Sequence, residues 1–237
     1  MPRVDLIQFE SDTALAAAAA DQWLEHAREA RRAGDRCRVA LSGGRIAKVF
    51  FSAIAAAARR SNVDLDHVDF FWADERCVPP DHSESNFAAA REALLAPLKT
   101  QSERIHRIQG ELPPAQAAAE ANAELARVLA SDASRPAVLD LVILGMGEDG
   151  HVASLFPEGP GDPSPNPAPY RAVVASKPPP HRVTLSYAMI ASARSVWVLA
   201  SGAGKSEALS RSLISTQTPL GKVRVSRAEL RIFSDIS

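Results

Sequence analysis

Cysteine is scarce in this sequence, where only Cys37 and Cys77 occur among 237 residues. Their spacing is typical of neither a metal site nor a disulfide framework, so we expect reduced thiols. No stretch approaches the roughly 18 apolar residues of a membrane helix. The opening residues, MPRVDLIQFESD, also lack the charged start and apolar core of a signal peptide. We therefore expect a cytoplasmic protein that does not enter a membrane.

The sequence has little excess charge of either sign. Lys and Arg total 27 against 28 Asp and Glu, which leaves a formal net charge of −1 at pH 7. Because nucleic-acid binding relies on a broad basic surface, this balance argues against it. Any anion that the protein binds is expected to be small and held locally, and nothing indicates an obligate protein partner.

Several catalytic signatures are missing as well. There is no G-x-S-x-G elbow, no placed cysteine nucleophile and no H-x-x-x-H spacing, which argues against covalent catalysis and against zinc. Gly145, Gly147 and Gly150 have the spacing of a dinucleotide-binding loop, but the proline-rich segment after Phe156 cannot begin the helix that such a loop requires. Tyr170 stands where an acid would bind ribose. We predict no metal and no organic cofactor.

Apolar, β-branched runs alternate along the chain with alanine-rich segments of helical period. The predicted strands are residues 4–9, 37–41, 68–72, 139–144, 172–175 and 195–200, and the predicted helices are 12–33, 46–60, 85–96, 115–131, 186–192 and 204–214. This alternation indicates an α/β fold, with one three-layer αβα domain over residues 1–237 and a mostly parallel, Rossmann-like sheet. The proline-rich segment 159–169 is interpreted as a mobile loop beside a site rather than as a domain linker.

Polar or glycine-rich residues follow four of the predicted strands. They are Ser42-Gly43-Gly44, Asp74-Glu75-Arg76, the stretch from Gly145 to His151, and Ser201-Gly202-Ala203-Gly204-Lys205. The carboxyl ends of parallel strands meet at one edge of a sheet, where ligands bind in open α/β folds. These four turns are therefore expected to share one pocket.

Three parts of the sequence are candidates for binding an anion. The small residues 42–44 let backbone N–H groups at a helix start point at an anion, although a tight turn without a ligand explains them equally well. Lys205 lies near the positive end of a predicted helix, a conflict that a phosphate would relieve; a solvated lysine is the alternative. Arg182 follows three prolines and either binds phosphate through two hydrogen bonds or pairs with a carboxylate.

His151 is the candidate general base. It follows Asp149 and Gly150 at the end of an apolar strand, where glycine leaves room for a substrate. Asp149 either orients the imidazole ring or only hydrogen-bonds its own turn. Arg76, in the turn after residue 72, is either part of an exposed salt-bridged turn or a functional group.

Taken together, the motifs resemble the 6-phosphogluconolactonase family. The matching stretches are SGG at 42–44, WADERCVPPDHSESNF at 72–87, LGMGEDGHVASLFPE at 144–158, PPPHRVTLS at 178–186 and SGAGKSEAL at 201–209. The resemblance implies hydrolysis of 6-phospho-D-glucono-1,5-lactone to 6-phosphogluconate in the oxidative pentose phosphate pathway. It also implies a single αβα fold that is shared with glucosamine-6-phosphate deaminases, and no cofactor.

The resemblance implies roles for individual residues. The substrate phosphate would be held by Ser42, Gly43, Gly44, Arg182 and Lys205, and His151 would be the base with Asp149 beside it. Arg76 would bind or orient the substrate. Asp74 and Gly147 are also expected to be substrate-binding residues. Where the family usually continues S-G-G-S-T-P, this chain has Arg45-Ile46-Ala47. Arg45 either replaces the missing hydroxyl contact by charge or points into solvent.

Three other functions compete with this interpretation. A glucosamine-6-phosphate deaminase would share the phosphate clamp and the Asp-Gly-His turn, but deaminases typically continue A-F-N-E-P where residues 153–157 read ASLFP. A non-catalytic sugar-phosphate sensor is commonly fused to a DNA-binding module, for which one domain of this length leaves no room. An NAD- or NADP-dependent oxidoreductase is the least favoured.

Overall fold

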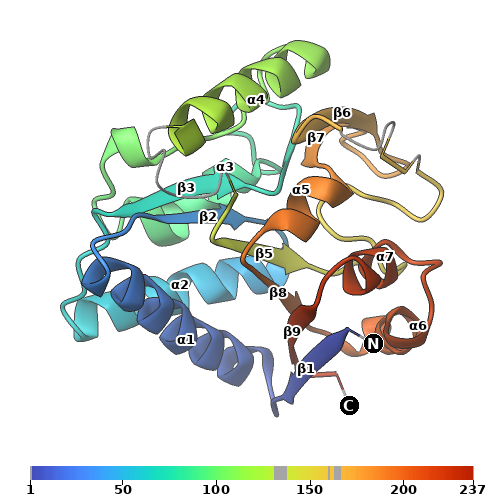
Figure 1. The fold of residues 1–237 in the computed structure, drawn as a ribbon, viewed down its shortest axis with the longest axis horizontal. Helices are drawn as coiled ribbons and strands as arrows, with labels where there is room; N and C mark the ends of the chain where they lie inside the picture. The colour runs from blue at the N-terminus through green and yellow to red at the C-terminus, as the bar shows by residue number, and fades with distance from the viewer. Residues whose placement is uncertain (1, 131–137, 160, 163–166, 237) are drawn as a thin grey trace.

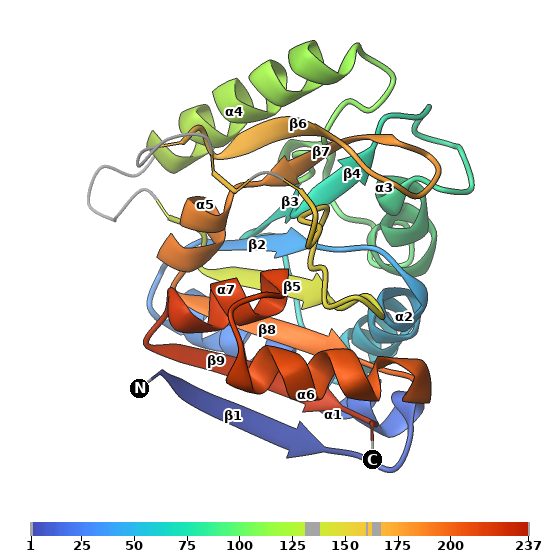
Figure 2. The same ribbon diagram turned by 90° about the vertical axis from the view of Figure 1, so that its right-hand side faces the viewer.

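Six strands form the main sheet, and every neighbouring pair in it runs parallel. The computed structural model describes residues 2–130, 138–159, 161–162 and 167–236. Across the sheet the order is β1 (Arg3–Gln8), β9 (Glu229–Ser234), β8 (Ser195–Ala200), β5 (Leu141–Gly145), β2 (Cys37–Leu41) and β3 (Val68–Trp72). In Figure 2 the arrowheads of β1, β2, β5 and β8 point the same way. The predicted α/β fold with a mostly parallel sheet is confirmed.

The strand order changes direction between β2 and β5, which are hydrogen-bonded neighbours through Val39 and Leu141. From β2 the chain adds β3 on one side, whereas from β5 it adds β8 and β9 on the other. A crevice opens beyond the carboxyl ends of the strands at such a reversal. The fold therefore directs a ligand to the turns that follow Leu41 and Leu144.

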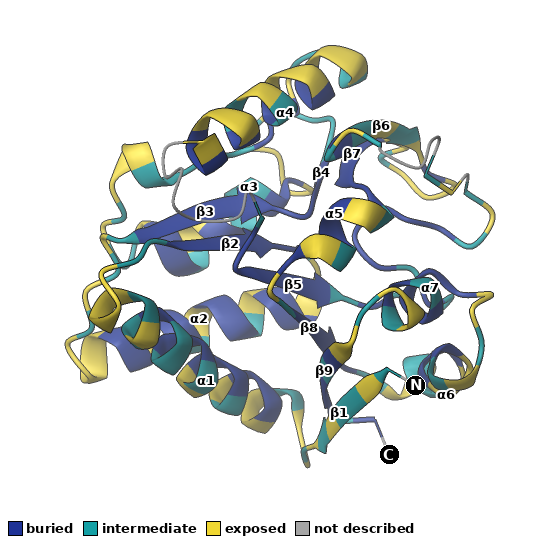
Figure 3. Cartoon of the chain, viewed as in Figure 1, coloured by how far each residue is buried: buried dark blue, intermediate teal, exposed yellow. Residues whose placement is uncertain are grey.

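Helices cover both faces of the main sheet. Figure 1 shows α1 (Asp12–Arg32) and α2 (Arg45–Arg60) on one face, and α5 (Tyr187–Ser192), α6 (Ser206–Ile214) and α7 (Pro219–Val225) on the other. Because both faces are covered, β2 and β3 are buried at every position. Figure 3 shows the buried strands between helices whose outer faces are exposed.

A second, antiparallel sheet stands beside the main one, and it corrects two predictions. It consists of β4 (Asp74–Arg76), β7 (His181–Leu185) and β6 (Tyr170–Val174), with α4 (Pro114–Ala130) packed against β6 and β7. Asp74-Glu75-Arg76 is therefore a strand and not a turn, because Arg76 pairs with Arg182 across the sheet. The strand predicted at 172–175 belongs to this sheet rather than to the main one.

Other differences concern individual helices, strands and loops. The sequence interpretation missed β9, β7 and α7. The helix predicted at 85–96 is α3 (Asn86–Ala90) followed by a wider π-helical turn at Arg91–Leu95. The helix predicted at 115–131 is α4, whose last described residue is Ala130, and the loop predicted at 159–169 falls partly outside the described residues. In the part of the chain that is described, no helix has the length and apolar character needed to cross a membrane.

Tyr170 ties the second sheet to the end of β3. Its hydroxyl donates to the Trp72 carbonyl at 2.8 Å, and burial raises the pKa of the phenol. Tyr170→Phe is expected to lower the free energy of unfolding by about 1 kcal/mol, because a buried carbonyl loses its side-chain donor. Urea denaturation measures the change. Tyr187→Phe is the control, since the Tyr187 hydroxyl donates no hydrogen bond to any described residue; equal midpoints for the two variants would contradict the prediction.

Candidate active site

A polar cavity of about 110 Å³ lies beyond the carboxyl ends of β2 and β5. It is lined by Ser42, Gly43, Gly44, Arg45, Ile46, Asp74, Arg76, Asn86, Gly145, Met146, His151, Ala153, Arg182 and Lys205. The predicted meeting of four distant segments at one edge is thus confirmed. Of the site residues predicted from the sequence, only Asp149 and Gly147 are outside this wall, and both contact His151.

The turn between β2 and α2 supplies one end of the cavity. Gly44 has a φ of 99°, a left-handed conformation that favours glycine, and it precedes α2 without a side-chain cap. The first N–H groups of any helix lack intrahelical partners, so they are available to a ligand. The nearby Ser42 hydroxyl is buried and has no hydrogen-bond partner among the described residues. A buried orphan hydroxyl beside a helix N-terminus fits a bound anion.

Lys205 approaches this end from the turn after β8. It closes a 3₁₀ turn, Ala203–Lys205, at the start of α6. Burial lowers the pKa of its amine, and the neighbouring Arg45 charge lowers it further, whereas Glu148 and Asp235 oppose that change. Two cations that destabilise each other in this way would both be stabilised by a phosphate between them.

Arg45 is hydrogen-bonded at the edge of the cavity, although most of its side chain is exposed. Its Nη1 donates to Asp12 Oδ2 at 2.9 Å, and its Nη2 donates to Ser201 Oγ at 3.2 Å. The side chain is 64% exposed and nevertheless lines the cavity. Hydrogen bonds thus hold the guanidinium at the cavity, while most of the side chain stays in contact with solvent. The guanidinium braces the turn after β8 against the start of α2.

Two more arginines lie in the opposite wall. Arg182 Nε donates to the Pro179 carbonyl at 3.0 Å, and its guanidinium lies 5.7 Å from the centre of the Phe156 ring. Burial lowers the pKa of Arg182, and the Arg76 charge adds to this effect. Within the described residues Arg182 makes no ion pair, so the alternative of a structural carboxylate partner is not what the structure has. Arg76 donates from Nη1 to the Glu84 carbonyl at 2.7 Å.

His151, which is paired with Asp149 behind it, forms the remaining side. His151 Nδ1 lies 2.5 Å from Asp149 Oδ1, and the same oxygen accepts the His151 backbone N–H at 3.1 Å. Asp149 thus does both things that the sequence left as alternatives: it orients the ring and hydrogen-bonds its own turn. Burial alone would raise the pKa of Asp149, but its interactions with His151 bring the pKa below the ordinary value. With Nδ1 engaged, Nε2 is the ring nitrogen that remains for a ligand.

The comparisons with known proteins bear on the identity of this site. A family model described as glucosamine-6-phosphate isomerases/6-phosphogluconolactonase matches residues 10–232. The chain belongs to this family. Among curated relatives, the 6-phosphogluconolactonase of Streptomyces coelicolor is 33% identical over 88% of this chain and 82% of its own. The human 6-phosphogluconolactonase is 38% identical over 76% of this chain and 70% of its own.

Solved structures give the same family. The 6-phosphogluconolactonase from Trypanosoma brucei is similar with a TM-score of 0.83 and 26% identity, covering 99% of this chain and 97% of its own. The enzyme from Trypanosoma cruzi reaches a TM-score of 0.85 at 25% identity, covering 99% and 96%. The resemblance inferred from the motifs, to the 6-phosphogluconolactonase family, is confirmed.

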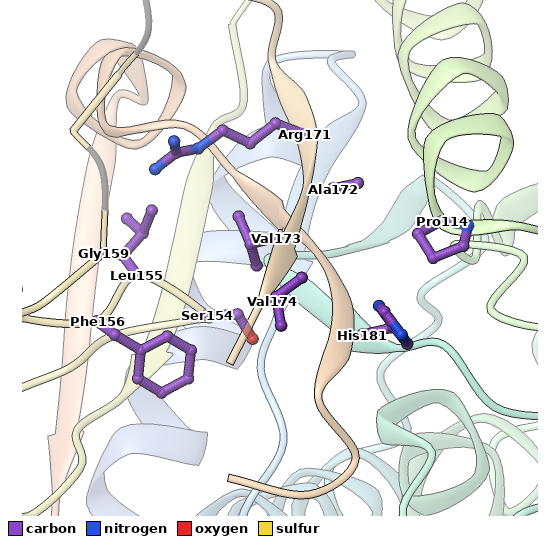
Figure 4. Close-up of a pocket in the computed structure, with 10 residues that line it drawn as sticks. All are labelled: Pro114, Ser154, Leu155, Phe156, Gly159, Arg171, Ala172, Val173, Val174 and His181. Carbon is purple, nitrogen blue, oxygen red and sulfur yellow. The ribbon is translucent and has the colours of Figure 1, made fainter. Parts of the chain in front are cut away.

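A larger hollow of about 380 Å³ is lined in part by residues 154–156. Figure 4 shows its wall, where Leu155, Phe156, Val173 and Val174 are apolar and Arg171 and His181 stand apart from each other. None of the predicted site residues lines it. A member of this family that binds a charged sugar phosphate is better served by the smaller cavity, where four cationic side chains converge.

The cavity also contains residues to which sequence reasoning assigned no role. They are Ile46, Asn86 and Ala153. Ala153 has a φ of 49°, a strained conformation for a residue with a Cβ, and such strain is concentrated at functional sites. Asn86 stands inside the quoted stretch 72–87, so that motif was the signal that could have drawn attention to it.

Proposed function

We propose that this protein hydrolyses 6-phospho-D-glucono-1,5-lactone to 6-phospho-D-gluconate, the lactone-opening step of the oxidative pentose phosphate pathway, and that His151 activates the attacking water. The observation that carries the proposal is the Asp149–His151 pair, at 2.5 Å, facing a cavity ringed by Arg45, Arg182 and Lys205. An acid–base group and an anion clamp in one cavity suit a phosphorylated substrate. The cytoplasmic location stays a prediction from the sequence.

The phosphate is placed at the β2–α2 turn. The Ser42 hydroxyl and the N–H groups that begin α2 donate to it, and Lys205 and Arg45 balance its charge. Asp74 is not a phosphate ligand, because its Oδ2 already accepts a hydrogen bond from Ser154 Oγ at 2.7 Å and a carboxylate would repel a phosphate. This arrangement leaves the lactone ring between the phosphate and His151.

The chemical step needs one base and one stabilised oxyanion. His151 Nε2 removes a proton from water as its oxygen bonds to the lactone carbonyl carbon, and the carbonyl oxygen becomes negative. Arg76 or the backbone N–H groups of residues 145–150 stabilise that charge. The bond from the same carbon to the ring oxygen then breaks, and the imidazolium protonates the departing oxygen. The new carboxylic acid ionises, so each turnover releases one proton.

Proton release provides the test. Purified protein added to freshly made 6-phosphogluconolactone in weak buffer is expected to acidify the solution faster than buffer alone, whereas unphosphorylated gluconolactone should be opened far more slowly because the phosphate clamp stays empty. A rate equal to the buffer blank would contradict the function. Ammonia release from glucosamine 6-phosphate, measured in parallel, would instead support a deaminase.

A further inference from the structure

The Asn86 amide has a fixed orientation in the wall of the cavity. Its Nδ2 donates to two oxygens of Asp74, the carbonyl at 2.9 Å and Oδ1 at 3.2 Å. Both are acceptors, so the amide nitrogen must face them and the amide oxygen must face away. Oδ1 lies over Gly43, where a Cβ would come within 1.8 Å of it. Gly43 is therefore required by the position of Asn86.

The Asn86 oxygen lacks a donor. Asn86 is 3% exposed, and no described residue donates a hydrogen bond to its Oδ1, which is not one of the fully buried atoms without a partner and so keeps some accessible surface. Because Asn86 lines the cavity, this acceptor without a protein donor is available to a ligand bound there. A phosphate dianion offers only acceptor oxygens and cannot donate to it. A sugar hydroxyl is a donor and can.

Neighbouring side chains hold Asn86 rigidly. The buried Glu75 carboxylate accepts hydrogen bonds from the backbone N–H groups of Asn86, at 2.7 Å, and of Phe87, at 2.8 Å. Burial raises the pKa of Glu75, and these backbone hydrogen bonds oppose that rise. Since the backbone is held by Glu75 and the amide by Asp74, the acceptor is preorganised. A preorganised acceptor discriminates strongly between ligands with and without the matching donor.

We propose that Asn86 selects the sugar ring of the substrate, by accepting a hydrogen bond at Oδ1 from one ring hydroxyl while the cations of the cavity hold the phosphate. The inference rests on the proposed function, because it takes the lactone as the occupant of the cavity. It divides the site into a phosphate end at Ser42 and Lys205 and a hydroxyl end at Asn86. Discrimination between sugar phosphates would then arise at the hydroxyl end.

The experiment combines changes in the substrate with a change in the protein. The 2-, 3- and 4-deoxy analogues of 6-phosphogluconolactone are compared with the parent lactone, using wild type, Asn86→Ala and the control Asn122→Ala. Asn122 is a suitable control because its amide bonds the Tyr170 backbone, away from the cavity. Binding of 6-phosphogluconate and its three deoxy analogues, measured by calorimetry, runs in parallel and requires no turnover.

One deoxy analogue is expected to lose about 10- to 100-fold in kcat/KM and in affinity with wild type and with Asn122→Ala. With Asn86→Ala, kcat/KM and affinity for the parent compound should fall by a similar factor. The difference between the parent and that deoxy analogue should then shrink to about twofold or less. A purely structural role for Asn86 would weaken the parent and all analogues equally, and that result would overturn the proposal. The proposal would also be overturned if the wild-type protein hydrolysed all three deoxy analogues with the same kcat/KM as the parent lactone. This measurement does not depend on whether Asn86→Ala folds. Hydroxyl-dependent binding without hydrolysis would refute the proposed function and leave this inference standing.

Discussion

His151→Ala is expected to lower kcat for 6-phosphogluconolactone by about 10²–10⁴-fold, the range that general acid–base catalysis usually supplies. The remaining rate would come from the phosphate clamp and from the groups that stabilise the oxyanion. Affinity for 6-phosphogluconate, measured by calorimetry, should change little, because Ser42, Lys205 and Arg182 are untouched. The loss should thus appear in kcat and hardly in KM.

A second histidine provides the control for this variant. His181 lies in the wall of the larger, apolar hollow and not in that of the polar cavity, so His181→Ala should retain activity within about twofold. Comparing the activities of the two variants shows which of the two hollows is the active site. If His181→Ala were the inactive variant and His151→Ala the active one, the active site would have been assigned to the wrong hollow.

The main sheet and its ligand-binding edge could be predicted because the evidence for them is local. The strand at 139–144 is apolar throughout, as a strand covered on both faces must be, and glycines follow it directly. β9 was missed because its sequence, ELRIFS, mixes charged and apolar residues. Arg231 in that strand is accommodated by an ion pair with Asp5 at 2.8 Å, a partner more than two hundred residues away in the sequence. No local pattern indicates such a partner.

The second sheet and the role of Asn86 could not be predicted for a related reason. Three consecutive polar residues at 74–76 have the composition of a turn, and only pairing with β7 makes them a strand. Glu75 is 2% exposed, which is rare for a carboxylate. It is tolerated because backbone N–H groups from the start of α3 satisfy it. The sequence shows which residues can donate or accept hydrogen bonds, whereas only the three-dimensional structure shows which of them pair with one another.

The pair Arg45 and Asp12 shows how a site can depart from its family pattern. Residues 45–47 replace the usual Ser-Thr-Pro, and the sequence left the consequence open. In the structure the arginine joins three segments, since it contacts Asp12 at the start of α1 and Ser201 after β8. A hydroxyl at position 45 could not span that distance. The substitution therefore adds a brace to the phosphate end of the cavity as well as a positive charge.

Gly147→Ala is expected to reduce kcat/KM by about 10²-fold or more, although it removes no functional group. A Cβ at position 147 would lie 2.0 Å from His151 Nδ1 and 2.7 Å from Asp149 Oδ1, so the imidazole would have to move. Its 2.5 Å contact with Asp149 would break, and misplacement of a catalytic group by about 1 Å can cost that much in rate. Gly161→Ala is the control, because a Cβ there meets no atom within 4 Å. Lactone hydrolysis at the wild-type rate would show that the ring position is not critical.

The double variant makes this prediction sharper. If Gly147→Ala acts only by displacing His151, adding it to His151→Ala should cost nothing further, because the two changes remove the same contribution. If the losses multiply instead, Gly147 has a role of its own. Its backbone N–H donates to the His151 carbonyl at 2.9 Å and belongs to the loop proposed to stabilise the oxyanion, so multiplying losses would place that loop, rather than the ring position, at the centre of the effect.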